Sequence, residues 1–512
     1  MVFCSVLFKA IDAGVSRKSL EAPDFFTDLN LDQIVDGITA GKDEYNLKPF
    51  FYAPQRDVDE VVYRQEVMQD MENTTVREKV ESFAQDMRTM RQRLALASKM
   101  HYAYQKERWF LEAVGVYCDA VESLARNLGL VDVKSRGLLG ICEFLEGYVA
   151  SPGFSSLLAQ TKKLKADLSS VHYSTLVSGN RIKVQKYESE IDYSAEVERT
   201  FEKFKQGAVK DYLLKFRTGE DMNHVEAQVL DLVARLHPET FQDLDAYYGR
   251  NAGYLDETVA AFDREVQFYI SYLDFIEIVR RAGLQFCYPR MSKASKEISS
   301  FGGFDLALAR KLVIEGSSPI VSNDFFMKGK ERIFIVSGPN QGGKTTFSRA
   351  FGQMHYLASL GCPVQGREAQ LFLFDRLFTH FEKEEDIRNL RGKLEDDLVR
   401  IHRILTAATS DSILIMNEIF NSTTLKDAIF LGKKVMEKII LLDLVCVCVT
   451  FIDELSSMSE RTVSMVSMVD PENHAVRTFK VARKPADGLA YAISIAEKYR
   501  LTYDSLKERI PS

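Results

Sequence analysis

A glycine-rich loop directly after a buried strand restricts the fold of this chain more than any other feature of its sequence. Residues 332–337 (RIFIVS) have the apolar, β-branched character of a buried strand, and residues 338–345 read GPNQGGKT. The loop has the form G-x-x-x-x-G-K-[ST], in which backbone N–H groups surround phosphates and the following helix presents its positive N-terminus. The sequence therefore predicts a strand, a phosphate-binding loop and a helix in succession.

The side chains of this loop have distinct expected roles in the binding of ATP and Mg²⁺. Lys344 can reach the β- and γ-phosphates, so it serves both binding and catalysis, and the Thr345 hydroxyl can hold Mg²⁺. The residues expected to contact the nucleotide here are Gly338, Pro339, Asn340, Gln341, Gly342, Gly343, Lys344, Thr345 and Thr346.

Polar residues also follow a second buried strand, at 412–416. Asn417 and Glu418 come directly after it, and the polar segment 421–424 follows. A phosphate loop needs an acidic group at the end of a neighbouring strand to complete the metal shell and to activate water. We interpret Glu418 as the residue that polarises the attacking water and Asn417 as a metal neighbour. The alternative is an ordinary strand end capped by a polar pair.

Short apolar runs alternate with helical stretches throughout residues 301–512, which is typical of a mostly parallel α/β sheet. The expected strands are 312–314, 333–337, 370–374, 413–416 and 444–449, and the runs 462–469 and 475–481 extend the sheet. The expected helices follow Lys344, Gly392, Leu425 and Asp487. We interpret 301–512 as one α/β domain.

Residues 1–300 read instead as long helices, because apolar residues recur there at spacings of three and four. One stretch runs from 60 to 100 with a break at Asn73 and Thr74, and another runs from 254 to 282. Residues 173–187 are β-branched on both sides of a Ser-Gly-Asn turn, so we expect a β-hairpin within the helical region. The fold class is thus a helical region followed by an α/β domain.

Composition limits the classes of partner. A hydrophobic content of 46%, a formal net charge of −7 and a pI near 5.8 describe an acidic globular chain that is not drawn to nucleic acid or anionic membranes as a whole. The seven cysteines are scattered without metal-binding spacing, and no leader or membrane span is evident. We expect a cytoplasmic protein whose nucleic-acid contacts, if it makes them, are local.

The ordered motifs of the C-terminal part resemble the ATPase domain of the MutS family of DNA mismatch repair proteins, which are ABC-type P-loop ATPases. The similar segments are 338–346 (the family's GPNxGGKST), 374–379 (DxIFTR), 421–427 (GRGTSTYD), 450–455 (THYHEL) and 484–488 (the closing segment). Residues 320–324 resemble the family's stretch near the adenine site, which makes Asn323 a candidate nucleotide contact. The helical region resembles the family's core and lever helices.

Three positions depart from the family pattern. Asn417 stands where the family has Asp, and Phe451 stands where it has the His that resembles a γ-phosphate sensor. Gly392 replaces the Ser of the family's composite signature, and its N–H together with Lys393 can still face a phosphate held by a second subunit. A missing carboxylate in the outer metal shell implies slow hydrolysis.

The resemblance does not extend to mismatch reading, because no segment before the helical region is similar to the family's GxFYE-type segment; we therefore expect a short form without that domain. Basic residues cluster in and after the predicted hairpin, and acidic residues interleave with those that follow it. The basic residues are Arg181, Lys183, Lys186, Lys203, Lys205, Lys210, Lys215 and Arg217. They form either a solvated face or a surface for the DNA backbone.

The sequence therefore favours an ATP-dependent DNA-binding protein of the MutS type, a homodimeric nucleotide-gated clamp with composite nucleotide sites and slow ATPase activity. The main alternative is a nucleotide-gated clamp that acts on a protein or RNA partner. A third possibility is a helical scaffold whose loop binds nothing.

Overall fold

The computed structural model describes residues 5–9, 21–189, 196, 199–200, 222–317, 319–382, 392–470, 472, 476–486 and 506–507. The chain divides into two compact units, each made of three separate segments of the sequence. The helical unit contains Met1–Phe3, Thr74–Val133 and Leu139–Asp263, and the sheet unit contains Cys4–Asn73, Lys134–Leu138 and Arg264–Ser512. The domain boundary at residue 300 stays a prediction.

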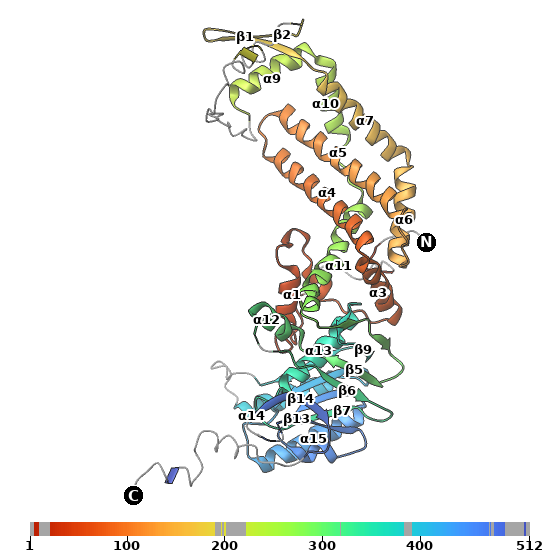
Figure 1. The fold of residues 1–512 in the computed structure, drawn as a ribbon, viewed down its shortest axis with the longest axis vertical. Helices are drawn as coiled ribbons and strands as arrows, with labels where there is room; N and C mark the ends of the chain where they lie inside the picture. Colours follow the sequence, from red (N-terminus) through yellow and green to blue (C-terminus); the bar gives the residue numbers. More distant parts are fainter. Residues whose placement is uncertain are drawn as a thin grey trace. The chain divides into compact units, whose positions relative to one another are not determined.

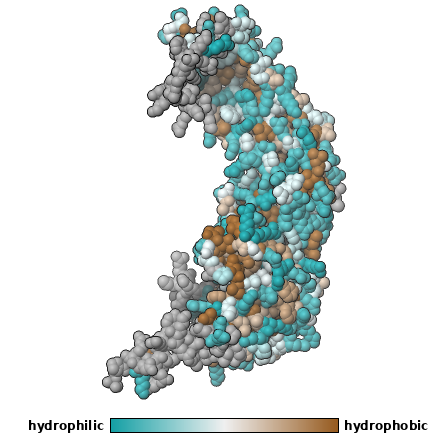
Figure 2. All heavy atoms as spheres, viewed as in Figure 1, coloured by the Kyte–Doolittle hydropathy of each residue, from teal (hydrophilic) through white to brown (hydrophobic). Residues whose placement is uncertain are grey.

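Long amphipathic helices build the helical unit (Figure 1). They are α4 (Thr74–Lys99), α5 (Ala103–Leu128), α7 (Pro152–Ser169), α9 (His224–Leu236) and α10 (Pro238–Arg250), with most of α6 (Arg136–Val149) and the start of α11 (Glu257–Arg281). In α4 the buried residues Val76, Val80, Phe83, Met87 and Met90 recur every three or four positions. This stripe gives α4 one apolar side to pack against α5, while the face visible in Figure 2 is largely hydrophilic.

The helical unit also carries the β-hairpin that the sequence predicts at residues 173–187. Strand β1 (Tyr173–Ser178) pairs antiparallel with β2 (Arg181–Lys186) around Gly179, whose φ of 61° suits a tight turn. Val184 packs against a small core of Val233, Ala234 and Phe241 on α9 and α10. The base of the hairpin is thus anchored to these helices.

A six-stranded sheet organises the sheet unit, in the order β10-β11-β12-β7-β13-β14. Its strands are β7 (Ile333–Ser337), β10 (Leu377–Phe381), β11 (Ile413–Asn417), β12 (Val445–Val449), β13 (Thr462–Val469) and β14 (Arg477–Arg483). All neighbours run parallel except β13 and β14. The predicted combination of long helices and a mostly parallel α/β sheet is confirmed.

Helices pack on this sheet and smaller sheets stand beside it. The described helices of the unit are α1 (Leu31–Thr39), α2 (Lys48–Phe51), α3 (Val58–Glu72), the part of α11 from Arg264 onward, α12 (Leu306–Glu315), α13 (Lys344–Ser359), α14 (Lys393–Ala407), α15 (Leu425–Leu442) and the 3-10 turns Asp43–Tyr45 and Asp453–Ser457. A four-stranded sheet has the order β4-β9-β5-β6, from Arg290–Ser292, Glu368–Phe372, Ile298–Gly303 and Asn323–Met327, and β3 (Phe286–Cys287) pairs with β8 (Val364–Gln365).

One predicted strand is wrong. Residues 312–314 belong to α12, which begins after its N-cap Asp305 and ends at Gly316, where φ is 60°. The run Leu-Val-Ile is apolar and β-branched, and such a short run fits a strand or a helix equally well. The Asp305 N-cap and the Gly316 C-cap stabilise the helical form of the whole segment, so the run folds as part of α12.

The centre of the large sheet is fully buried. Every residue of β7 and β12 is buried, as are the first four residues of β11. Cys446 and Cys448 lie in this core, where burial raises the pKa of both thiols. Among the described helices, none is long and apolar enough to cross a membrane.

Candidate nucleotide-binding site

The loop between β7 and α13 has a backbone shape that suits phosphate. Gly338 (φ 114°), Gln341 (φ 59°) and Gly343 (φ 92°) adopt left-handed conformations, and turns that contain such residues are of the kind that gathers backbone N–H groups around an anion. A Cβ atom on Gly342 would lie 2.2 Å from the Ser467 hydroxyl oxygen, so only glycine fits there. The Ser467 hydroxyl donates to the Gly342 carbonyl at 2.5 Å and holds the loop against β13.

Lys344 is buried inside this loop, with 5% of its surface exposed. Its Nζ donates to the carbonyl oxygens of Gly338 (3.0 Å) and Pro339 (3.1 Å) and to Oδ1 of Asn340 (3.2 Å). These acceptors are neutral, so their hydrogen bonds do not cancel the ammonium charge. Burial lowers the pKa of Lys344, and the nearby Glu418 carboxylate partly opposes that shift. The loop therefore holds a positive charge that an anion would stabilise.

The Thr345 hydroxyl donates to Oδ1 of Asn417 at 2.9 Å. Thr345 lies in the first turn of α13, and Asn417 is the last residue of β11, so the parallel sheet brings the two predicted metal neighbours together. A hydroxyl and an amide oxygen are hard oxygen donors of the kind Mg²⁺ accepts, and this cation commonly keeps waters and phosphate oxygens as its remaining ligands. The residues present thus fit a magnesium ion bound together with a triphosphate.

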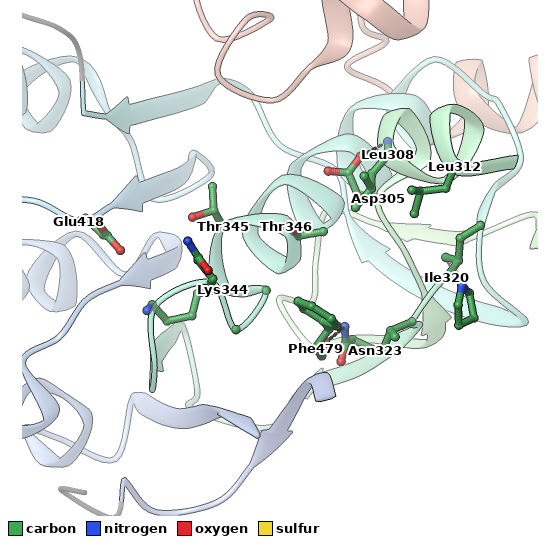
Figure 3. Close-up of a pocket in the computed structure, with 15 residues that line it drawn as sticks. Asp305, Leu308, Leu312, Ile320, Asn323, Lys344, Thr345, Thr346, Glu418 and Phe479 are labelled. Carbon is green, nitrogen blue, oxygen red and sulfur yellow. Dashed lines mark hydrogen bonds between the residues drawn. The ribbon is translucent and has the colours of Figure 1, made fainter. Parts of the chain in front are cut away.

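Glu418 follows β11 in a conformation that few side chains adopt. Its φ is 55°, and its N–H donates to the Val449 carbonyl at 2.9 Å. Phe420, two residues on, also has a positive φ of 62°. Non-glycine residues in this region are strained and concentrate at functional sites. The turn directs the Glu418 carboxylate toward the cavity beside Lys344 and Thr345 (Figure 3).

These groups border a cavity of about 370 Å³, which falls within the range of small-molecule sites. Its lining consists of Asp305, Leu308, Leu312, Pro319, Ile320, Val321, Asn323, Gln341, Gly342, Gly343, Lys344, Thr345, Thr346, Glu418 and Phe479. The polar phosphate loop and Glu418 lie on one side, while Leu308, Leu312 and Ile320 lie on the other (Figure 3). The cavity thus has a polar end for phosphates and an apolar end for a planar base.

Asn323 and Phe479 form the floor between these ends. The Asn323 amide donates to the Phe479 carbonyl at 3.3 Å and accepts from the Val481 N–H at 2.7 Å. Phe479 has a φ of 58° and remains half exposed, so its ring is available to cover a ligand. Arg477 Nε donates to the Asn340 carbonyl at 3.2 Å, which ties β14 to the phosphate loop.

Other predicted site residues lie elsewhere. Gly392 and Lys393 are at the start of α14, and neither belongs to the cavity lining within the described part of the chain. Lys393 pairs with Glu382. Phe451 follows β12 with half of its surface exposed, outside the same lining. Of the closing segment, residues 487 and 488 fall outside the described residues.

Sequence reasoning missed most of the apolar end. Asp305, Leu308 and Leu312 belong to α12 and its N-cap, and the sequence predicts no helix there and only a short strand at 312–314, so it does not place them beside the phosphate loop. Phe479 lies in a strand that was predicted only as an extension of the sheet. Its position depends on a left-handed backbone that no sequence pattern announces for an aromatic residue.

The hairpin of the helical unit carries the described part of the predicted basic surface. Arg181, Lys183 and Lys186 are exposed on β2, and residues 172–187 contain no acidic side chain. Val177 at the turn is 71% exposed. Lys203, Lys205, Lys210, Lys215 and Arg217 fall outside the described residues. The visible part of this surface is therefore positive and partly apolar.

The part of the chain that holds the site is similar to proteins of a known family. Residues 334–507 match the family model described as MutS domain V. The DNA mismatch repair protein MutS of Thermosipho melanesiensis is 29% identical over 203 residues, which cover 38% of this chain and 24% of that protein. The MutS protein of Chlorobaculum tepidum is 25% identical over 303 residues, which cover 58% and 32%. The chain thus spans about a quarter to a third of the length of these curated relatives.

Proposed function

We propose that this chain, which belongs to the MutS family through its domain V, is an ATP-dependent DNA-binding protein. It works in the cytoplasm as a dimeric, nucleotide-gated clamp, and it hydrolyses ATP slowly. The observation that carries this proposal is the convergence of Lys344, Thr345 and Glu418 on one two-ended cavity. A site of this composition accommodates a triphosphate at one end and a base at the other.

Each end of the cavity has a part in holding ATP. The N–H groups around Gly338 and Gly343 and the ammonium of Lys344 bind the phosphates. The ring of Phe479 and the side chains of Leu308 and Leu312 enclose the base. When bound beside Thr345 and Asn417, Mg²⁺ supplies positive charge that offsets the charge of the β- and γ-phosphates.

Glu418 is the residue that orients and polarises water for attack on the γ-phosphate. The carboxylate lies in the cavity on a constrained turn, and the Asn421 amide is 3.4 Å from its Oε2. Asn417 offers a neutral oxygen where the family has a carboxylate. Phe451 has no group that can hydrogen-bond to a phosphate. Both features slow hydrolysis relative to ATP binding.

Asn417→Asp is expected to raise the steady-state rate of ATP hydrolysis. A carboxylate at this position accepts the Thr345 hydrogen bond as the amide does and adds a negative charge near the metal, which strengthens the outer metal shell by about tenfold. The measurement is turnover as a function of Mg²⁺ concentration. An unchanged rate and an unchanged Mg²⁺ midpoint would show that Asn417 does not limit hydrolysis.

The hairpin supports the DNA part of the proposal. Arg181 and Lys183 extend from one strand beside exposed Leu176 and Val177, with no acidic residue between them. Lysine and arginine contacts to phosphates release counterions, so binding of this kind weakens steeply with salt. Backbone contact of this type requires no reading of base sequence.

Changing Arg181, Lys183 and Lys186 together to Gln is expected to weaken duplex DNA binding and to reduce the slope of log K against log salt by about 2–3. ATP binding should not change, because the hairpin and the cavity belong to separate units. The measurement is fluorescence anisotropy at several salt concentrations.

The matched control is the change of Lys426, Lys433 and Lys438 to Gln, which removes the same charge from exposed positions on α15. If both triple variants lose the same affinity, the hairpin has no special role. If no DNA form binds while RNA or a protein partner does, the alternative clamp replaces this proposal.

The dimer is proposed from the position of the composite signature. Gly392 is exposed at the N-cap of α14, and a Cβ atom there would meet no atom of the described residues within 4 Å. In the proposed dimer, the Gly392 N–H and the Lys393 side chain contact the phosphates of the nucleotide that is bound to a second copy of the chain. Sedimentation with and without ATP tests the dimer. A chain that stays monomeric in both conditions would contradict a nucleotide site shared by two subunits.

A further inference from the structure

Gln353 links the helix of the phosphate loop to the helix at the apolar end of the cavity. It lies on α13, nine residues after Lys344, and its side chain is fully buried. Its Oε1 accepts from the Leu306 N–H at 2.8 Å, and its Nε2 donates to Oδ1 of Asp305 and to the Leu29 carbonyl, both at 2.9 Å. Both amide hydrogens and the amide oxygen therefore have partners.

This arrangement allows only one orientation of the amide. A flipped side chain would set its NH₂ group against the Leu306 N–H and its oxygen against the Asp305 carboxylate and the Leu29 carbonyl. A buried amide with three good partners is costly to disturb, since each lost partner leaves a polar group without compensation. The contact between α12 and α13 is consequently specified by polar geometry and not by apolar packing alone.

The linked elements supply opposite ends of the cavity. Helix α13 begins with Lys344 and Thr345 at the phosphate end. Asp305 caps α12 by accepting from the Leu308 N–H at 3.1 Å, and Leu308 and Leu312 line the apolar end. The distance between the two ends therefore depends on how α12 is seated on α13.

We propose that Gln353 is a positioning residue of the nucleotide site, which fixes the apolar end at the distance from the phosphate loop that a nucleoside triphosphate requires. The inference rests on the proposed binding of ATP in this cavity. Gln353 lies outside the cavity lining and acts through Asp305 and α12. Without the three hydrogen bonds of Gln353, α12 shifts. The base then loses its contacts with the apolar end, while the phosphates keep their contacts with the phosphate loop.

The test compares ATP with inorganic tripolyphosphate, which engages the phosphate loop and has no base. Gln353→Met keeps the side-chain length and removes the hydrogen bonds. It is expected to raise the Kd for ATP about tenfold and to leave the Kd for tripolyphosphate within about twofold. Ser359→Ala is the matched control, because this hydroxyl is equally buried on α13 but donates only within its own helix, to the Tyr356 carbonyl at 2.6 Å.

Equal weakening for both ligands would overturn the inference, because it would mean that the phosphate loop itself is damaged. Unchanged ATP affinity would overturn it as well. Equal affinity of the wild type for ATP and tripolyphosphate would also overturn the inference, because the base would then gain nothing from the apolar end. A wild type that binds neither ligand would overturn the proposed function, and the inference with it.

A second measurement needs no variant and covers the case in which Gln353→Met does not fold. Hydrogen exchange of the Leu306 and Leu308 amides in the wild type reports on the seating of α12. ATP is expected to slow this exchange by about tenfold more than tripolyphosphate does. Equal slowing by the two ligands would contradict a link between α12 and base binding.

Discussion

Lys344→Met is expected to abolish ATP binding, raising the Kd by about 100-fold or more. The reason is electrostatic: a desolvated ammonium inside a loop of N–H groups interacts with phosphate far more strongly than an exposed one. Its hydrogen-bond acceptors are all neutral, so no carboxylate in these bonds competes with the ligand. Binding of a fluorescent ATP analogue measures the effect directly.

The same variant separates loss of binding from loss of fold. Burial lowers the pKa of Lys344, because loss of water disfavours the charged ammonium. Replacing it with an apolar side chain of similar length should therefore leave the free energy of unfolding without nucleotide within about 1 kcal/mol of the wild type. The stabilisation by added ATP should disappear.

Lys330→Met is the matched control, because Lys330 is exposed and pairs only with exposed Glu460 among the interactions described. It should bind ATP as the wild type does. Retained ATP affinity in Lys344→Met would mean that the loop is not the nucleotide site and would favour the scaffold hypothesis.

Glu418→Gln is expected to lower the rate of ATP hydrolysis by about 10²–10³-fold while ATP affinity stays within about threefold. The amide keeps the shape of the side chain and its place on the constrained turn after β11. It removes the carboxylate that polarises water, and it also removes a negative charge near the γ-phosphate. Single-turnover hydrolysis, with binding measured separately, resolves the two effects.

Glu460→Gln provides a control of the same chemistry at an exposed position. A Glu418→Gln variant with normal turnover would assign water activation to another group. A variant that loses binding and turnover together would assign Glu418 a structural role in the cavity.

Much of the fold follows from local sequence patterns. The strand before the phosphate loop is predicted because five consecutive apolar or small residues precede a glycine-rich segment, and β7 is fully buried. The break between α3 and α4 falls at Asn73, where the extended backbone of that residue ends the helix. Asn417 and Glu418 could be placed near Thr345 because parallel strands end at one edge of a sheet.

The rest depends on contacts between distant segments. The run at 312–314 became part of a helix because of Asp305 and Gly316, which lie outside the run itself. The role of Gln353 depends on Leu29 and Asp305, which are 324 and 48 positions away in the chain. No periodic pattern encodes such partners. In the sequence, a buried Gln that only fills space on a helix cannot be told from one that holds a neighbouring helix in place.

Nucleotide-dependent DNA binding tests the central claim most directly. We expect the affinity for duplex or branched DNA at low salt to change by about tenfold or more when ATP and Mg²⁺ are added. The change should be absent in Lys344→Met and should diminish as salt is raised. DNA affinity that is the same with and without ATP in the wild type, at every salt concentration, would contradict the account.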